Sequence, residues 1–351
     1  MPPQPYLQCI MEARATLSRE QARELMQQIF LGQLSDLDIA ALLGGLSARG
    51  ETPEEIAGFV DSMRAVATPL PLGDAERAHL TDTCGTGGDA SGTFNISTAA
   101  ALVAAAAGAT VAKHGNRAVT SRCGSADVLE ALGIPVGLTP PEAAQALRSH
   151  RFAFLHAPSL HPAMKAVLPV RRALGIRTVF NILGPLTNPA GASAQVMGVY
   201  APHLVPLVAE AMASLGTRHA FVVHGDTGTS QTRTGLDEIS ISGPSHVAEV
   251  RTTPGAAATI TLSTITPEQF GLNRAPIESL TGGDAATNAA ILRHIFAGAP
   301  GPQRDVVLLN TAAVLVTAGI AADLAAGIHL AARTIDHGQV TELLSQLSRI
   351  P

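Results

Sequence analysis

The sequence predicts an α/β protein in which a small all-helical domain accompanies a larger α/β domain with a central, largely parallel sheet flanked by helices. Two observations lead to this prediction. The first seventy or so residues follow a helical apolar pattern, whereas the residues after them alternate short apolar strands with helices. The length of 351 residues also suggests about two domains.

Three helices are predicted in the N-terminal part. Apolar residues after Ser18 recur at the one-face spacing of an amphipathic helix, and 35–48 and 52–66 follow similar patterns. Thr52 begins its helix as a capping residue, followed by a proline in the first turn and acids near the positive end of the helix dipole. The Pro- and Gly-rich stretch 69–73 then predicts a linker.

Beyond this linker the predicted elements alternate, which indicates a mainly parallel sheet. Short apolar runs predict strands at 109–112, 194–200 and 220–224. Helices are predicted at 97–107, 125–132, 140–148 and 202–215. The C-terminal part is predicted to be mainly helical from Asn288 onward.

Composition excludes several classes of protein. Apolar residues make up 46% and charged residues 15%, which predicts a large core and argues against global disorder. A net charge of −5 argues against a nucleic-acid or anionic-membrane partner. Cys9, Cys84 and Cys123 are too scattered for a disulfide framework or a zinc motif. The N-terminus lacks signal-peptide features, and the uncharged run 96–112 is interpreted as a buried helix, so a cytoplasmic protein is expected.

A glycine-rich loop is the first candidate for anion binding. The segment 83–89, Thr-Cys-Gly-Thr-Gly-Gly-Asp, precedes 94–98, Phe-Asn-Ile-Ser-Thr, and then an Ala-rich helix. Such a loop brings backbone N–H groups to a helix N-terminus, where the helix dipole also favours a phosphate. The alternative is a glycine-rich turn with an ordinary helix cap.

Other phosphate loops fit less well. The dinucleotide pattern starting at Gly85 lacks an acidic residue about twenty positions on, because the next carboxylate after Asp89 is Asp127. The Walker pattern fails since no Gly-Lys-Ser/Thr is present. The segment 226–230 resembles the phosphate loop of flavodoxin-like phosphoribosyltransferases, but the paired acids that precede that loop are missing, so we treat it as a coincidence.

A second loop carries positive charge. Lys113, His114, Asn116 and Arg117 follow a predicted strand and can supply charge and directed hydrogen bonds to a polyanion. Ser125, at the start of the next helix, has an alternative role as a helix N-cap.

Asp237 and Glu238 are adjacent acids, and only a turn or loop would let both face one site. Mg²⁺ prefers carboxylates together with substrate phosphate oxygens and waters, but a surface acidic pair is the simpler interpretation of these two residues alone.

The segment 161–189 is open to two interpretations. Arg171 could hold a carboxylate with two parallel hydrogen bonds, and Gly184 could expose backbone beside an apolar slot. A cationic helix followed by a turn explains the same residues, and the pattern alone does not decide between them.

Taken together, the motifs resemble the anthranilate phosphoribosyltransferase family, within the nucleoside phosphorylase/phosphoribosyltransferase fold. They occur in the family's order, and the similarity extends from the N-terminal helices almost to the end of the chain. The matching motifs occupy 85–89, 94–99, 113–117, 123–127, 161–165, 181–186 and 236–240.

The resemblance implies a homodimer with an active site in the interdomain hinge cleft of each subunit. It implies a helical domain of residues 1–72, joined by a later segment at about 168–190. Residues 74–167 and 191–351 would then form the α/β domain that binds phosphoribosyl pyrophosphate.

The resemblance also implies the substrates, the metal and the reaction. Such an enzyme transfers the phosphoribosyl group to the amine of anthranilate, giving N-(5-phosphoribosyl)anthranilate and pyrophosphate in tryptophan biosynthesis. It requires Mg²⁺, with two ions per subunit when substrate is bound. No certain acid or base is implied, and His114 is a weak candidate for proton acceptor.

By resemblance, three groups of residues form the site. The residues implied for phosphoribosyl pyrophosphate are Gly85, Gly87, Gly88, Asp89, Thr93, Asn95, Ser97, Thr98, Lys113 and Ser125. Those implied for anthranilate are Gly85, His114, Asn116, His161, Arg171 and Gly184. Those implied for Mg²⁺ are Ser97, Asp237 and Glu238.

One segment departs from the family pattern. The stretch from Asp226 to Gly235 is several residues longer than the family leads us to expect, which affects the predicted position of Asp237 and Glu238. Three rival functions stay open: a nucleoside phosphorylase, a nucleic-acid-binding protein of the same fold, and a phosphoribosyltransferase for another arylamine. The last is the one that the sequence excludes least.

Overall fold

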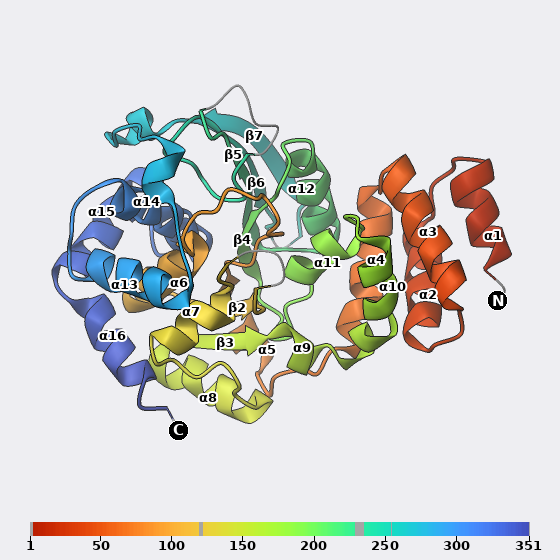
Figure 1. The fold of residues 1–351 in the computed structure, drawn as a ribbon, viewed down its shortest axis with the longest axis horizontal. Helices are drawn as coiled ribbons and strands as arrows, with labels where there is room; N and C mark the ends of the chain where they lie inside the picture. The colour runs from red at the N-terminus through yellow and green to blue at the C-terminus, as the bar shows by residue number, and fades with distance from the viewer. Residues whose placement is uncertain (1–2, 119–121, 229–234, 254, 351) are drawn as a thin grey trace.

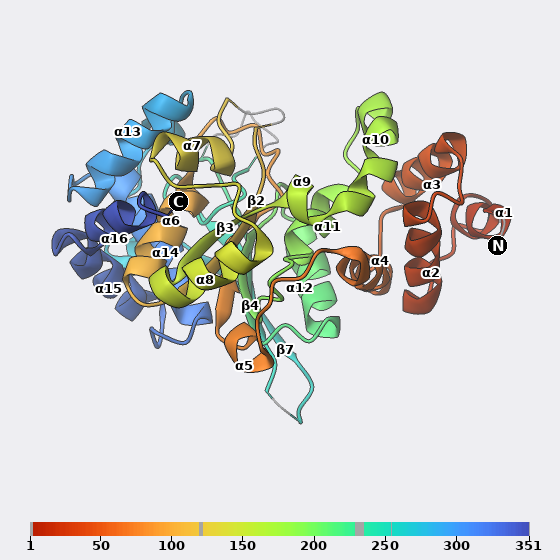
Figure 2. The same cartoon turned by 90° about the horizontal axis from the view of Figure 1, so that it is seen from below.

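The computed structural model describes residues 3–118, 122–228, 235–253 and 255–350. A helical bundle lies at one end of the molecule and a sheet with its covering helices makes up the rest (Figure 1, Figure 2). The bundle contains α1 (Gln4–Leu7), a π-helical turn (Gln8–Glu12), α2 (Arg19–Phe30), α3 (Asp36–Arg49) and α4 (Pro53–Val66). This arrangement confirms the predicted pairing of a helical domain with a larger α/β domain.

Two later helices return to this bundle. The 3₁₀ turn Pro162–Ala166 leads into α10 (Leu168–Leu174), which contacts α3, and α11 (Phe180–Leu186) contacts α4. Buried residues of this return segment, such as Val170 and Leu183, share an apolar core with Leu42 and Phe59 of the bundle. The bundle is therefore completed by residues more than a hundred positions further along the chain.

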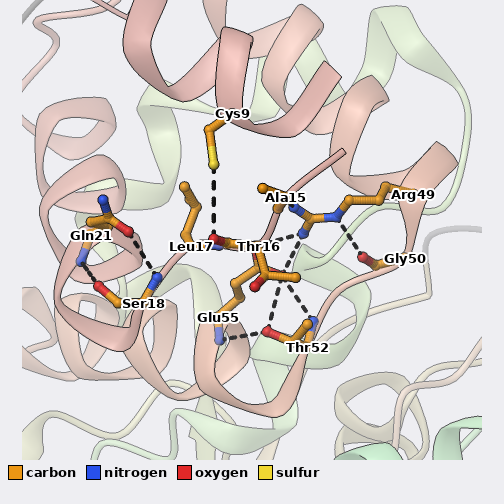
Figure 3. A network of polar contacts seen from close by, with 10 residues as sticks. All are labelled: Cys9, Ala15, Thr16, Leu17, Ser18, Gln21, Arg49, Gly50, Thr52 and Glu55. Carbon is orange, nitrogen blue, oxygen red and sulfur yellow. Dashed lines mark hydrogen bonds and ion pairs between the residues drawn. The ribbon is translucent and has the colours of Figure 1, made fainter. Parts of the chain in front are cut away.

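The α2–α4 side of the bundle is held by a buried carboxylate (Figure 3). The Glu55 side chain is fully buried, and the Arg49 guanidinium binds its two oxygens at 2.6 and 2.5 Å. Glu55 also accepts the N–H of Leu17 at 2.8 Å and that of Thr52 at 2.9 Å. Thr52 caps α4 as predicted, with its hydroxyl accepting the Glu55 N–H. One carboxylate thus joins the starts of α2 and α4 to the end of α3.

Removing this carboxylate should destabilise the bundle. Glu55→Ala leaves the nearly buried Arg49 charge without its carboxylate partner, which is expected to lower the free energy of unfolding by about 3–5 kcal/mol. Urea unfolding followed by circular dichroism measures the change. Glu20→Ala is the control, since Glu20 pairs with Arg23 on the surface and should change stability little. A loss no larger than that of the control would contradict the assignment.

The sheet has seven strands in the order β3-β2-β1-β4-β5-β6-β7. The first five are parallel to their neighbours, and β6 and β7 add an antiparallel edge. The strands are β1 (Leu80–Asp82), β2 (Thr110–Gly115), β3 (Phe152–His156), β4 (Ala194–Gly198), β5 (His219–Gly225), β6 (Ser245–Arg251) and β7 (Thr259–Ile265).

The sequence predicted β2, β4 and β5 but missed the other four strands. Strand β1 is only three residues long, and threonine and serine separate the apolar residues of β7, so neither contains the short apolar run that predicted β2, β4 and β5. The predicted strand 194–200 also ends earlier, at Gly198.

Alternate strand residues enter opposite cores, as the pleat of a strand requires. Val196 and Phe221 belong to the core beneath α6, whereas their neighbours Met197 and Val222 belong to the core shared with α12 and the bundle. The first core is covered by α6 (Ile96–Ala106), α7 (Ser125–Ala131), α13 (Ala285–Phe296), α14 (Pro302–Thr317), α15 (Leu324–Asp336) and α16 (Gln339–Leu347).

On the other face, α12 (Leu204–Ser214) packs on β5 and β6, and α8 (Pro140–His150) packs on β3. Short turns complete the chain: α5 (Asp74–Arg77), α9 (Ala157–Leu160), Pro267–Phe270 and Ile277–Leu280. The predicted helical C-terminal part is confirmed from Ala285 onward. Among the described residues, no helix is long and apolar enough to span a membrane.

Candidate active site

The candidate residues converge at the carboxyl ends of the parallel strands. The glycine-rich loop follows β1, Lys113 lies near the end of β2, and Gly198 ends β4. Asp237 and Glu238 come from the segment after β5. Ligand sites of open α/β sheets occur at this edge, because the loops that leave neighbouring strands meet there.

The glycine-rich loop is fixed by contacts with β4 and with Asp237. The Thr86 N–H donates to the Gly198 carbonyl at 2.9 Å, and the Gly87 N–H donates to the Asp237 carboxylate at 2.7 Å. Gly87 and Gly88 have φ values of +63° and +74°, a region that disfavours other residues. The loop can therefore approach a ligand with its backbone.

At Gly198 the backbone of strand β4 lies directly against the backbone of Asp237. A Cβ atom built on it would lie 1.5 Å from the backbone oxygen of Asp237, so any side chain would displace the acidic segment. No sequence motif marks Gly198, because its neighbour Asp237 is 39 positions further along the chain.

Lys113 lies beneath the loop with only 2% of its surface exposed. Its ammonium group donates to the hydroxyl of Thr83 at 2.9 Å and to that of Ser97 at 3.4 Å. Its charge lowers the pKa of Glu238 and of Asp82 against the effect of burial. Lys113 thus provides positive charge between Thr83, at the start of the glycine-rich loop, and Ser97, at the start of α6.

Asp237 and Glu238 both face the loop, as the prediction of a common site requires. The Glu238 carboxylate accepts the Ser97 N–H at the start of α6 at 3.0 Å. Enclosure by protein atoms raises the pKa of Glu238 to about 7. It also raises the pKa of Asp237 well above its usual value, with the charges of Asp89 and Glu238 adding to the effect. The two carboxylates therefore lie where the protein supplies too little positive charge to keep both of them readily ionised.

The two ends of the longer segment that precedes them lie together. Gly225 and Leu236 exchange two backbone hydrogen bonds of 2.8 and 2.7 Å, which join the two ends of the 226–235 stretch. Residues 229–234 of that stretch lie outside the described residues. Asp226 accepts the Gly228 N–H with its own side chain, which makes a local turn at the start of the stretch.

The residues fit a hard divalent cation that retains ligands from substrate and water. In the described part of the chain, no group of three or more His, Cys, Asp or Glu side chains is arranged to hold a metal by itself. Mg²⁺ needs no closed protein cage and prefers carboxylate, phosphate and water oxygens. A small cavity here is lined by Thr83, Gly85, Ser97, Ala100, Val196, Gly198, Asp237, Glu238, Asn310 and Val314.

Other residues implied for the phosphoribosyl donor lie along the same loops. Asp89 accepts the backbone N–H of Ser91 at 3.0 Å, and Thr93 pairs with Thr281. Thr98 is buried in the first turns of α6, and its hydroxyl has no hydrogen-bond partner among the described residues. The Asn95 side chain donates to the Cys123 carbonyl at 3.2 Å.

Ser125 does not cap α7, which corrects its alternative role. The N-cap is Gly124, and the Asp127 carboxylate accepts the Gly124 N–H at 2.8 Å in place of a serine hydroxyl. Ser125 instead donates to the Asn116 carbonyl at 3.2 Å. Arg117 forms ion pairs with Glu130 and Asp127, so its charge is directed toward α7.

Two of the residues implied for anthranilate form a pair of neutral imidazoles. The rings of His114 and His161 lie 5.1 Å apart, and both side chains are buried. Burial lowers the pKa of His114 to about 3 and that of His161 to about 4. The Gly184 backbone borders His114. Such a His114 is a poor proton acceptor near neutral pH, although a neutral ring can still accept a hydrogen bond.

Arg171 and Asn116 are less closely associated with that pair. The Arg171 guanidinium lies over the Phe180 ring, 5.4 Å from its centroid, and burial lowers its pKa. Asn116 is exposed, and its side-chain oxygen accepts the Arg117 N–H at 2.8 Å.

Asp82 is a buried carboxylate that was not predicted from the sequence. It joins the glycine-rich loop after β1 to the loop that carries Lys113 and His114 at the end of β2, and these are the two anion loops of the site. Asp82 accepts the N–H groups of Thr83 at 2.7 Å, Cys84 at 3.1 Å and His114 at 3.1 Å through one oxygen. Its other oxygen accepts the Asn188 amide at 2.8 Å. A polar residue at the end of a buried strand was the available signal, but its partners come from three separate segments.

Arg177 was also missed as a residue near the site. It lies between α10 and α11, places its guanidinium 4.1 Å from the Tyr200 ring centroid, and donates to the Gly88 carbonyl. The return segment of the bundle is therefore in direct contact with the glycine-rich loop.

Known proteins share both parts of this architecture. The helical bundle domain of a glycosyl transferase family matches residues 4–67, and the a/b domain of a glycosyl transferase family matches 77–341. A protein named anthranilate phosphoribosyltransferase from Desulforamulus reducens is 49% identical over 335 residues, covering 95% of this chain and 93% of its own.

Solved structures agree with these matches. Anthranilate phosphoribosyltransferase from Thermus thermophilus has a TM-score of 0.86 and 43% identity, covering 98% of both chains. The Saccharomyces cerevisiae enzyme in complex with PRPP and Mg has a TM-score of 0.85 and 27% identity, covering 99% of this chain and 97% of its own. Its complex with 4-fluoroanthranilate has a TM-score of 0.83 and 26% identity, with the same coverage.

Proposed function

Because this chain belongs to the anthranilate phosphoribosyltransferase family, we propose roles for its residues in the family's reaction. The enzyme transfers the phosphoribosyl group of phosphoribosyl pyrophosphate to the amine of anthranilate, giving N-(5-phosphoribosyl)anthranilate and pyrophosphate in tryptophan biosynthesis. The observation that carries the role assignments is the convergence of the glycine-rich loop, Lys113 and the Asp237–Glu238 pair at one edge of the sheet.

The donor is bound by the two anion loops. The loop backbone at Gly85, Gly87 and Gly88 lies against the phosphates, and Lys113 contributes positive charge. The hydroxyls and side chains of the remaining donor residues complete the contacts. These residues are Asp89, Thr93, Asn95, Ser97, Thr98 and Ser125.

Asp237, Glu238 and the Ser97 hydroxyl hold Mg²⁺, with two ions per subunit once the donor is bound. The raised pKa values of the two carboxylates support this assignment, because a bound cation supplies the positive charge that they lack. When bound, Mg²⁺ neutralises charge on the departing pyrophosphate.

Anthranilate is oriented by residues from both sides of the cleft. Arg171 pairs with its carboxylate, while Gly85, His114, Asn116, His161 and Gly184 line its approach. The aromatic amine is nucleophilic when neutral, so positioning matters more than a base. The amine nitrogen forms a bond to ribose C1, the bond from C1 to the pyrophosphate oxygen breaks, and the amine loses a proton. The low pKa of His114 argues against this residue as a strong base.

These roles also suggest how the chain is divided into domains. Residues 1–72 with about 168–190 form the helical domain, and 74–167 with 191–351 form the donor-binding domain. The contact of Arg177 with Gly88 supports a hinge cleft between them. We also propose a homodimer in the cytoplasm, on the basis of family membership.

Loss of anthranilate fluorescence tests these roles. Purified protein should consume anthranilate only when phosphoribosyl pyrophosphate and Mg²⁺ are both present, and chelation by EDTA should stop the reaction. Asp237→Asn with Glu238→Gln should raise the Mg²⁺ concentration required for half-maximal rate. An unchanged Mg²⁺ requirement would refute the metal assignment. Turnover of other arylamines but not of anthranilate would refute the acceptor assignment.

A further inference from the structure

A residue of the C-terminal helices reaches the back of the donor loop. Asn288 lies in the first turn of α13, with 2% of its surface exposed. Its Nδ2 donates to Asn95 Oδ1 at 2.9 Å, and its Oδ1 accepts the Gly283 N–H at 2.6 Å. Asn95 in turn donates to the Cys123 carbonyl at 3.2 Å. The side-chain amides of Asn288 and Asn95 therefore connect the 280–283 segment with the backbone of Cys123, which lies just before α7.

The two side-chain amides can be oriented in only one way. The Gly283 N–H is a backbone donor, so the Asn288 oxygen must face it and the Asn288 NH₂ must face Asn95. The Cys123 carbonyl is a backbone acceptor, so the Asn95 NH₂ must face it and the Asn95 oxygen must face Asn288. Neither amide can flip without placing two donors or two acceptors together.

The 280–283 segment is itself held against the donor loop. The Phe94 N–H donates to the Leu280 carbonyl at 3.0 Å, and the Gly282 N–H donates to the Gly92 carbonyl at 2.9 Å. A Cβ atom on Gly282 would lie 2.7 Å from Phe94 Cα, so the two backbones are in close contact. Asn288 therefore acts on a loop that is already aligned and leaves the Asn95 side chain as the group to be oriented.

We infer that Asn288 is a positioning residue that orients Asn95 and, through it, holds the two anion loops in register for the phosphoribosyl donor. This inference rests on the proposed donor-binding role of Asn95. Asn288 itself lies behind Asn95 and need not touch the substrate. Its loss should therefore weaken donor binding more than acceptor binding.

Steady-state kinetics with a double-mutant cycle tests this role. Asn288→Ala should raise KM for phosphoribosyl pyrophosphate about tenfold while KM for anthranilate changes little. In an Asn95→Ala background the same substitution should have almost no further effect on KM, because the residue it orients is absent. Calorimetric titration of the donor into each variant gives the same comparison without turnover.

A matched control separates positioning from a general loss of stability. Ala289→Gly weakens the same helix at the adjacent buried position and leaves the amide chain in place. It should lower Tm and leave KM for the donor unchanged. An Asn288→Ala enzyme with unchanged donor KM, or full additivity with Asn95→Ala, would overturn the inference. Failure of Asn95→Ala alone to weaken donor binding would instead overturn the proposed role of Asn95.

Discussion

Replacing Lys113 with methionine is expected to lower kcat/KM about 10²- to 10³-fold, the usual cost of removing one preorganised group that stabilises developing charge. Two effects act together. The ammonium group between Thr83 and Ser97 is lost where the donor's phosphates bind, and Glu238 loses the cation that lowers its pKa. Glu238 should then be protonated in a larger fraction of the molecules near neutral pH. Initial rates across a Mg²⁺ series measure both effects.

The control for this substitution is Lys165→Met, which changes the chain's other lysine at an exposed position. It should retain the wild-type rate. If Lys113→Met kept kcat/KM within about threefold of wild type, a difference smaller than that expected for a lost charge-stabilising group, the proposed role of Lys113 would be wrong.

Gly198→Ala is expected to disable the metal site without altering a single polar side chain. Its Cβ atom would lie 1.5 Å from the Asp237 backbone oxygen, so strand β4 and the acidic segment must move apart. A displacement of about 1 Å in a catalytic group can lower the rate about 10²-fold. The substitution should also destabilise the fold by about 1–3 kcal/mol, as overpacking does. Rates at saturating Mg²⁺ and thermal unfolding measure the two consequences separately.

Gly137→Ala is the matched control, because a Cβ atom there meets no atom within 4 Å and the residue is exposed. It should leave both rate and stability nearly unchanged. Normal Mg²⁺-dependent activity in Gly198→Ala would mean that the position of Asp237 is not critical.

Much of the fold could be predicted because it depends on neighbouring residues. The cap at Thr52 and the apolar faces of the bundle helices involve residues within one or two helical turns, and the structure confirms them. The long antiparallel edge was missed for a physical reason. Strand β7 contains no continuous apolar run, because threonine and serine separate its apolar residues, and most of it is exposed, so its position in the sheet depends on pairing with β6.

The sequence by itself determined the family of this protein and supplied the motifs that we propose carry its chemistry. Motifs such as the glycine-rich loop and the adjacent acids Asp237 and Glu238 can be recognised in the sequence, because the residues of each motif are contiguous. Only the tertiary structure decided how these segments are held together. Asp82 reaches Asn188 across 106 positions, and Asn288 reaches Asn95 across 193. Such contacts depend on strand order and helix packing, which bring distant backbone groups within hydrogen-bonding distance and leave no periodic trace in the sequence.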